Sequence, residues 1–431
     1  MTTASDDLPA RFRWLPPGLR PNVTMNVRQE RVFLLVGIAA LFAGYDLSVY
    51  GLAIPRIQLS LHIPENQVGL TISYFRIATL VAMPIAAMAD IVGRRRVLLV
   101  TVLGQGLCTL ATAFAADYTQ FVWLQILTRV FGYCEEMLIF VAIAEEVSAA
   151  ARGWSSGTLS AMYYVGIGFA SLSYAAVTIL PGDWRALYVI GAVPILLVAY
   201  LRRQLPETKR FESRDKEIRN LSSRINAGLD LLRRMGQEYP GRLTAMLISA
   251  GAFGFATAPA FVLSAKYIQS SLGYKPHEAT MLLIAGGLAG LGLSVRTGRL
   301  SDRLGRRPVL LTTVAITLIG YGIFYSGIGG IAAVVVWIVA NYAYIASDAM
   351  IAGFAVEIMP TAYRATVGSL RYLVQVGAGA ISLALEGVWY DHFHAHGPAI
   401  SISLMTIPIA LLGLLFLPEP SGRALEDISH A

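Results

Sequence analysis

Charged residues are scarce in this sequence. Asp, Glu, Lys and Arg make up 14% of the 431 residues, whereas about 25% is usual in soluble domains. Hydrophobic residues make up 55% of the chain, and the mean hydropathy is +0.59. This composition excludes a cytosolic globular protein.

Other absences narrow the function. The two cysteines, Cys108 and Cys134, both lie in apolar stretches, which excludes a disulfide framework and a cysteine zinc site. The sequence has no ATP-binding Walker loop, no nucleophile with a neighbouring base and no cluster of metal ligands in an apolar stretch. We therefore expect neither an enzyme nor an ATP-driven pump, and we expect no cofactor and no metal.

The first thirty residues do not resemble a signal peptide. They are polar, contain several arginines and lack an apolar core followed by a small-residue cleavage site. The first apolar stretch is therefore expected to act as its own insertion signal.

What the sequence does contain is long apolar stretches. Crossing about 30 Å of hydrocarbon takes about 20 apolar residues in a helix. Twelve stretches are of this kind: 32–55, 66–89, 97–115, 118–146, 157–179, 185–203, 243–266, 277–298, 308–325, 329–355, 364–389 and 397–417. The prediction is an all-α membrane protein with twelve transmembrane helices.

Basic residues indicate the orientation, because short cytoplasmic loops are enriched in Lys and Arg. With the N-terminus inside, 27 of the 34 basic residues fall in inner segments. We expect both termini to be cytoplasmic and the protein to lie in the inner or plasma membrane. The net charge of +7 then reflects membrane topology, so it does not indicate a nucleic-acid partner.

Short motifs recur at one constant spacing along the sequence. This spacing, the number of residues from Asp90 to Asp302, is here called the repeat offset. Asp90 to Arg95 corresponds to Asp302 to Arg307, Glu145 and Arg152 correspond to Glu357 and Arg364, and Leu205 to Glu207 corresponds to Leu417 to Glu419. A shared offset across distant motifs indicates a duplicated chain. We predict two pseudo-symmetric six-helix bundles, at 31–203 and 243–417.

The other segments are expected to be cytoplasmic. They are an N-terminal segment (1–30), a linker (204–242) and a C-terminal tail (418–431). In the linker, four apolar residues recur at helical spacing: Leu221, Ile225, Leu229 and Leu232. This spacing predicts an amphipathic helix at the membrane surface.

These motifs resemble those of a known transporter family. Residues 298–308, Gly-Arg-Leu-Ser-Asp-Arg-Leu-Gly-Arg-Arg-Pro, closely match the loop motif of the major facilitator superfamily, and residues 86–97 are a degraded copy of it. Further matches, to its branch of sugar porters and metabolite:proton symporters, are Gly44-Tyr45-Asp46, Glu145, Arg152, Glu357, Arg364 and Pro418-Glu419. The resemblance implies the major facilitator fold and secondary transport by alternating access.

In that superfamily the inner loops hold the cytoplasmic ends of the two halves together in one state. The resemblance assigns this conformational latch to Asp90, Gly93, Arg94, Glu145, Arg152, Asp302, Gly305, Arg306, Glu357 and Arg364. We expect each aspartate to lie at the N-terminus of a neighbouring helix, where N–H groups and the helix dipole stabilise a carboxylate. The alternative is that the arginines only fix the topology.

Ionisable residues in the apolar stretches are few, because each costs at least about 2.5–3.5 kcal/mol to insert. The candidates for proton coupling are Asp46, Glu136, Glu135 and Asp348. The repeat offset relates Glu136 to Asp348. The alternative for each acid is an ion pair that only holds helices together, such as Asp46 with Arg76.

Helical geometry separates the two neighbouring glutamates. Arg129, Gly132 and Glu136 are spaced by three and four residues and so share a face, whereas Glu135 points about 100° away. Arg129 and Glu136 are therefore expected to address the same space, either as functional groups or as an ion pair.

A second set of residues contains candidates for binding the solute. Guanidinium groups match the geometry of a carboxylate, and tyrosine combines an apolar face with a polar edge. The candidates are Arg76, Arg129, Arg371, Tyr45, Tyr163 and Glu386. By contrast, we expect His392, His394 and His396 to form an exposed loop tip rather than a metal site.

The leading hypothesis is a monomeric, proton-coupled symporter of a small organic acid, aromatic or another carboxylate, in a lipid bilayer. The alternative of a sugar:proton symporter is weakened, because residues 243–266 contain no glutamine to hydrogen-bond sugar hydroxyls as sugar porters do. A drug or organic-cation transporter is another alternative. A drug:proton antiporter would be expected to have its family's Gly-Pro motif in the fifth helix, and residues 157–179 contain no proline. A non-transporting receptor on the same fold is the remaining alternative.

Overall fold

The computed structural model describes residues 12, 20–21, 25–146, 152–203, 221–360 and 363–419. Within these ranges it places all side chains except those of 87, 90–92, 94–95, 140–142, 144–146, 152–153, 156, 221–227, 229, 291, 295 and 365. Every element of regular secondary structure in the described part of the chain is a helix.

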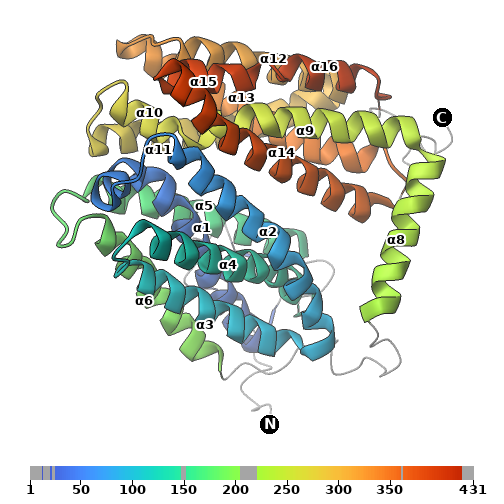
Figure 1. The fold of residues 1–431 in the computed structure, drawn as a ribbon. Coiled ribbons are helices and arrows are strands. Elements are labelled where there is room, and N and C mark those ends of the chain that lie inside the picture. The colour runs from blue at the N-terminus through green and yellow to red at the C-terminus, as the bar shows by residue number, and fades with distance from the viewer. Residues whose placement is uncertain are drawn as a thin grey trace. The chain divides into compact units, whose positions relative to one another are not determined.

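Six long helices form the first half of the chain (Figure 1). They are α1 (Val27–Leu61), α2 (Gln67–Val92), α3 (Arg94–Thr112), α4 (Tyr118–Glu146), α5 (Arg152–Ala175) and α6 (Trp184–Arg202). A further helix, α8 (Leu221–Glu238), lies in the segment where helical spacing predicts an amphipathic helix.

The second half repeats this order with two helices interrupted. Its helices are α9 (Pro240–Val262), α10 (Ser264–Ser270), α11 (Pro276–Leu304), α12 (Arg306–Tyr325), α13 (Gly330–Glu357), α14 (Arg364–Phe393), α15 (His396–Leu404) and α16 (Ile407–Leu415). The seventh predicted stretch continues into α10, and the twelfth divides into α15 and α16. Proline has no N–H to donate to the carbonyl four residues earlier and its ring clashes with that carbonyl, which explains why α15 ends at Leu404 and a new helix starts with Pro408 in its first turn.

The helix bounds follow the repeat seen in the sequence. Moved by the repeat offset, α4 would cover 330–358, and α13 covers Gly330–Glu357. The packing repeats as well: α1 packs against α5 as α9 packs against α14, and α3 packs against α4 as α12 packs against α13. The two halves therefore share one fold, as expected of a duplicated chain.

Nine helical segments in the described part of the chain are long and apolar enough to cross a membrane, and two of them are formed jointly by α9 with α10 and by α15 with α16. The apolar part of α3 is shorter, Arg96–Thr112, and α4 carries three ionisable residues in its middle, Arg129, Glu135 and Glu136. These features are typical of spans whose polar groups face protein rather than lipid.

Contacts divide the chain into two units. Unit 1 comprises Met1–Leu61 and Ala78–Leu221, and unit 2 comprises His62–Ile77 and Ser222–Ala431. The start of α2 belongs to unit 2 because it packs closely on α14. A methyl group added at Gly69 would overlap the carbonyl of Leu383, and one added at Gly387 would overlap that of Asn66.

Two glycines separate consecutive helices at equivalent places in the two halves. Gly93, between α2 and α3, has φ 110°, and Gly305, between α11 and α12, has φ 102°. Side chains other than glycine rarely adopt this conformation. The glycine of each loop motif is therefore required by the sharp turn between two helices.

Candidate functional site

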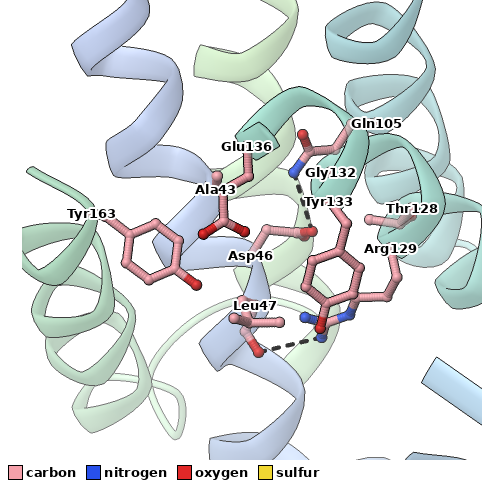
Figure 2. A pocket seen from close by; sticks show the side chains of 10 residues that line it. All are labelled: Ala43, Asp46, Leu47, Gln105, Thr128, Arg129, Gly132, Tyr133, Glu136 and Tyr163. Carbon is pink, nitrogen blue, oxygen red and sulfur yellow. Dashed lines mark hydrogen bonds between the residues drawn. The ribbon is translucent and has the colours of Figure 1, made fainter. Parts of the chain in front are cut away.

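The first candidate site is built around Asp46, near the middle of α1. Its side chain is buried, with 3% of the residue exposed. Two residues of α3 donate hydrogen bonds to it: Thr109 Oγ1 lies 3.2 Å from Oδ1, and Gln105 Nε2 lies 3.5 Å from Oδ2. Figure 2 shows the carboxylate between Gln105 and Arg129, with Glu136 and Tyr163 on its other side.

Arg129 of α4 supplies the positive charge of this site. Its guanidinium donates to the carbonyl of Leu47 at 3.2 Å, and its charge acts on the Asp46 carboxylate. Arg129 is 5% exposed, so the interaction is screened only weakly by water.

A small cavity adjoins Asp46. Its volume is about 20 Å³, and the lining residues all belong to unit 1: Ala43, Asp46, Leu47, Gln105, Thr128, Arg129, Gly132, Tyr133, Glu136 and Tyr163. A space of about 10–15 Å³ on this measure holds one water molecule. The cavity therefore has room for about one water molecule beside the Asp46 carboxylate.

The structure confirms the predicted faces of α4. Arg129, Gly132 and Glu136 all line the cavity. Glu135 points elsewhere and forms an ion pair with Arg202 of α6, with 2.8 Å between Oε1 and Nη1. The two neighbouring glutamates thus have different environments.

Asp46 and Arg76, considered from the sequence as an ion pair, have different neighbours within their own units. Asp46 accepts hydrogen bonds from α3, whereas Arg76 belongs to unit 2 and lies against α14, where a methyl group at Gly379 would be 2.6 Å from its Nη1. The sequence could not reveal the surroundings of Arg76, because α2 is divided between the two units.

The two tyrosine candidates also differ in their surroundings. Tyr163 lines the cavity beside Asp46. Tyr45 is 1% exposed, and its hydroxyl donates to the carbonyl of Leu187 at 2.9 Å. Tyr45 therefore links α1 to α6.

In unit 2, Asp348 of α13 is joined to Arg371 of α14 through Gln375. Gln375 Nε2 donates to Asp348 Oδ1 at 2.6 Å, and Arg371 Nη1 donates to Gln375 Oε1. These two contacts fix the orientation of the Gln375 amide. Asp348 occupies the position in α13 that the repeat offset relates to Glu136. There it accepts a hydrogen bond from α14.

Glu386 belongs to a second buried cluster, which sequence reasoning missed. His396 contacts Glu386 and Glu65, and Lys266 forms an ion pair with Glu65. The prediction of an exposed loop tip is correct for His392 and His394 but wrong for His396, which is 7% exposed. The isolated lysine in an apolar helix was the available signal, because such a residue needs a partner.

The loop motif of unit 2 forms a network of charged groups. Arg306 pairs with Asp302 at 2.8 Å and with Glu357 at 3.1 Å. The backbone N–H groups of Arg306 and Arg307 donate to Glu419, each at 2.8 Å. The carboxylate at the N-terminus of α12 is therefore Glu419, where the sequence predicted Asp302.

The other residues assigned to the latch are only partly visible. Arg364 Nε donates to the carbonyl of Met359 at 3.4 Å. The side chains of Asp90, Arg94, Glu145 and Arg152 lie outside the described part of the structure.

The linker helix is tied to the segment before α14. Tyr363 donates to Glu238 Oε2 at 2.7 Å. This hydrogen bond raises the pKa of Tyr363 above its usual value.

No group of three or more potential metal ligands is found among the described residues. The polar groups of the site are carboxylates, guanidinium groups and hydroxyls that contact one another.

Comparison with known families agrees with the helical repeat. The family described as Major Facilitator Superfamily matches residues 36–261 and 243–430. The chain belongs to this superfamily. It is an all-α, multi-pass membrane transporter with twelve transmembrane helices in two pseudo-symmetric bundles, and not an enzyme.

Individual proteins are similar over most of the chain. A probable 4-methylmuconolactone transporter of Cupriavidus pinatubonensis is 24% identical over 433 residues, which cover 97% of this chain and 96% of that protein. The 3-(3-hydroxy-phenyl)propionate transporter of Escherichia coli is 26% identical over 302 residues, covering 67% and 69%. A crystal structure of a D-xylose-proton symporter has a TM-score of 0.73 at 18% identity, over 91% of this chain and 99% of that one. This last similarity shows the fold alone.

Proposed function

We propose that the protein is a proton-coupled symporter of a small organic acid that works by alternating access. In this proposal it acts as a monomer in the inner membrane, with both termini in the cytoplasm. The observation that carries the proposal is the buried Asp46 carboxylate, which lies beside Arg129 and a water-sized cavity.

Asp46 is suited to carry the coupled proton. Burial disfavours an ionised carboxylate, whereas a nearby guanidinium and hydrogen-bond donors favour it. The two effects oppose each other at Asp46, which is buried and faces Arg129, Thr109 and Gln105. A change in water access then shifts the balance, so that the carboxylate binds a proton in one state and releases it in the other.

The duplication supports a special role for this site. At the repeat offset, Asp46 corresponds to Ala258 and Arg129 corresponds to Asn341. The second half therefore folds without this carboxylate and this guanidinium group. Since buried charges are costly and the fold does not require them, a function explains their presence in the first half.

The relatives favour an organic acid as the solute. One of them is described as a 3-(3-hydroxy-phenyl)propionate transporter, and a propionate carries a carboxylate. Because the cavity beside Asp46 is water-sized, we propose that the solute binds elsewhere and that Arg76 or Arg371 holds its carboxylate.

Two further parts of the proposal concern other residues. Glu136, which lines the Asp46 cavity, is a second candidate for the coupled proton. Asp302, Arg306 and Glu357 are proposed to belong to the conformational latch, since they already form one network in unit 2.

Transport in proteoliposomes tests the proposal. The wild-type protein should accumulate 3-(3-hydroxyphenyl)propionate against its gradient when a pH gradient is imposed. Asp46→Asn should abolish this accumulation and keep the downhill exchange of the same solute. Asp117→Asn is the matched control and should behave as wild type, because Asp117 only caps α4 by accepting from the N–H of Gln120, and asparagine caps equally well.

Two results would contradict the proposal. Uphill uptake by Asp46→Asn with normal pH dependence would exclude the coupling role of Asp46. Thermal stabilisation by D-xylose or a quaternary amine, but by no carboxylate, would exclude an organic acid as the solute, because a ligand of the folded state raises its melting temperature.

A further inference from the structure

Four ionisable side chains from separate parts of unit 2 meet in one buried cluster, here called the outer cluster. Glu65 comes from the turn before α2, Lys266 from α10, Glu386 from α14 and His396 from the first residue of α15. Lys266 is 1% exposed, Glu386 is 0% exposed and His396 is 7% exposed. The Glu65 side chain is the most accessible of the four, at 41%.

The contacts of the His396 ring determine how many protons the outer cluster holds. Nδ1 lies 2.7 Å from Glu386 Oε1, and Nε2 lies 3.1 Å from Glu65 Oε2. An ionised carboxylate only accepts hydrogen bonds, and a neutral imidazole donates from only one nitrogen. Both contacts are hydrogen bonds only if the ring is doubly protonated or one carboxyl group is protonated.

The charge balance of the outer cluster also indicates one additional proton. Lys266 contributes one positive charge, and the two carboxylates contribute two negative charges. One additional proton makes the outer cluster neutral, which matters because buried charges are costly unless they are paired.

We infer that Glu65, Lys266, Glu386 and His396 form a proton-binding site that is separate from Asp46 and takes up one proton from an adjoining cavity. Glu65 and His396 line this cavity, which has a volume of about 530 Å³. Its other polar walls carry hydroxyl groups, from Tyr267, Ser270, Ser271, Tyr325, Ser326, Tyr390 and Ser401. Such a lining accommodates the water that exchanges protons with the cluster.

The fold itself does not require these charges. At the repeat offset, Lys266, Glu386 and His396 correspond to Ile54, Tyr174 and Trp184. These three residues are at most 1% exposed. Unit 1 therefore fills the equivalent positions with apolar and aromatic side chains, and the ionisable groups of unit 2 serve another purpose than packing.

Other ionisable groups face the outer cluster. Tyr267 of α10 lines the cavity, and the charge of Glu386 acts on Tyr325 of α12. Tyr390 of α14 packs against the His396 ring, with 4.5 Å between centroids. Asp391 accepts from Asn66 at 2.9 Å, and His394 is exposed at the cavity wall. None of these is placed between His396 and its two carboxylates.

The proton of the outer cluster stabilises the attachment of the turn before α2. With the proton bound, His396 joins Glu65 in this turn to Glu386 in α14. Without it, one of the two His396 contacts places two acceptors against each other and is no longer a hydrogen bond. Proton binding therefore controls how firmly the turn is held to α14 and α15.

Proton binding is tested on the solute-free, detergent-purified protein, so the result does not depend on the transported solute. Nitrogen-15 NMR of the histidine rings reports their protonation, and infrared difference spectra between high and low pH report protonated carboxyl groups. His396→Gln identifies the His396 signal. At neutral pH we expect either a doubly protonated His396 ring or a neutral ring together with one protonated carboxyl group in the cluster. A neutral ring with no protonated carboxyl group would overturn the proposal.

Three variants should change the number of protons bound by the outer cluster in a pattern that packing alone does not explain. Glu65→Gln and Glu386→Gln should each lose the spectroscopic signal of the additional proton, because the remaining carboxylate balances Lys266. Lys266→Met should keep it, since the two carboxylates still require a proton. His392→Gln is the matched control and should be unchanged, because His392 is exposed near the end of α14. Loss of the signal in Lys266→Met together with its retention in Glu65→Gln would overturn the proposal, and Glu65→Gln tests it even if Glu386→Gln does not fold.

Discussion

Glu135 of α4 and Arg202 of α6 form an ion pair, with 2.8 Å between Oε1 and Nη1 and side chains that are 1% and 3% exposed. Arg202 also donates to the carbonyl of Leu35 in α1, at 3.5 Å. The pair thus connects three helices of unit 1. A buried pair of this kind contributes little net stability compared with apolar residues, but losing one partner leaves an unpaired buried charge.

The ion pair predicts unequal effects of single and double substitutions. At the equivalent positions the second half has Ser347 and Leu414. We expect Glu135→Ser or Arg202→Leu alone to destabilise the protein by about 3–5 kcal/mol. The double variant should be more stable than either single variant, because it removes both charges together. Thermal unfolding in detergent measures this difference.

The same variants test Glu135 as a proton carrier. If the pair is only structural, the double variant should retain proton-driven uptake in proteoliposomes. Normal stability combined with loss of uphill uptake would instead assign the coupled proton to Glu135. Destabilisation of the double variant by the sum of the single effects would contradict the pairing argument.

Two glycines of α5 predict opposite effects of the same substitution. A methyl group at Gly166 would overlap the carbonyl of Leu41 in α1, whereas one at Gly168 meets nothing within 4 Å. Gly166→Ala should therefore destabilise the protein by about 1–3 kcal/mol. Gly168→Ala should stabilise it by about 0.5–1 kcal/mol, because alanine favours a helix over glycine. Equal melting temperatures for the two variants would show that α1 and α5 do not approach closely.

Much of the fold could be predicted from the sequence because it depends on local patterns. Stretches of about 20 apolar residues define helices, and the repeat offset relates α4 to α13. The face shared by Arg129 and Glu136 follows from helix geometry alone. These features require no knowledge of which helices are neighbours.

The partners of the ionisable residues could not be predicted, because they come from distant parts of the chain. Asp46 binds to side chains 59 and 63 residues away. Glu65 and His396 are 331 residues apart. His396 has the sequence context of an exposed loop, and only the packing of α2 against α14 brings its two carboxylates together. Burial decided by tertiary packing leaves no periodic signal.

The loop motif of unit 2 allows stability and transport to be separated. The Asp302 side chain is 60% exposed in its pair with Arg306, and such pairs contribute less than about 1 kcal/mol. Asp302→Asn should therefore keep the melting temperature nearly unchanged. If the network acts as a latch, the variant should still lower the maximal transport rate. Unchanged transport kinetics would count against the latch.

Glu419 provides the contrasting case in the same loop. It accepts from the backbone of Arg306 and Arg307 at the start of α12, where a carboxylate also interacts favourably with the helix dipole. Glu419→Ala removes this cap and should destabilise the protein by about 0.5–2 kcal/mol. A larger loss for Asp302→Asn than for Glu419→Ala would show that the roles are reversed.

Arg371 is the final test, because its role in binding and its role in structure predict different kinetics. A charge-assisted hydrogen bond contributes about 1.5–3 kcal/mol. If Arg371 holds the carboxylate of the solute, Arg371→Lys should raise the apparent KM by at least about tenfold, because lysine lacks the planar fork of the guanidinium. Gln375→Leu, which removes the link between Arg371 and Asp348, should then have a smaller effect. If both variants instead lower only the yield of folded protein, with KM unchanged, Arg371 serves to join α13 to α14. Uptake by proteoliposomes at equal amounts of folded protein distinguishes these outcomes.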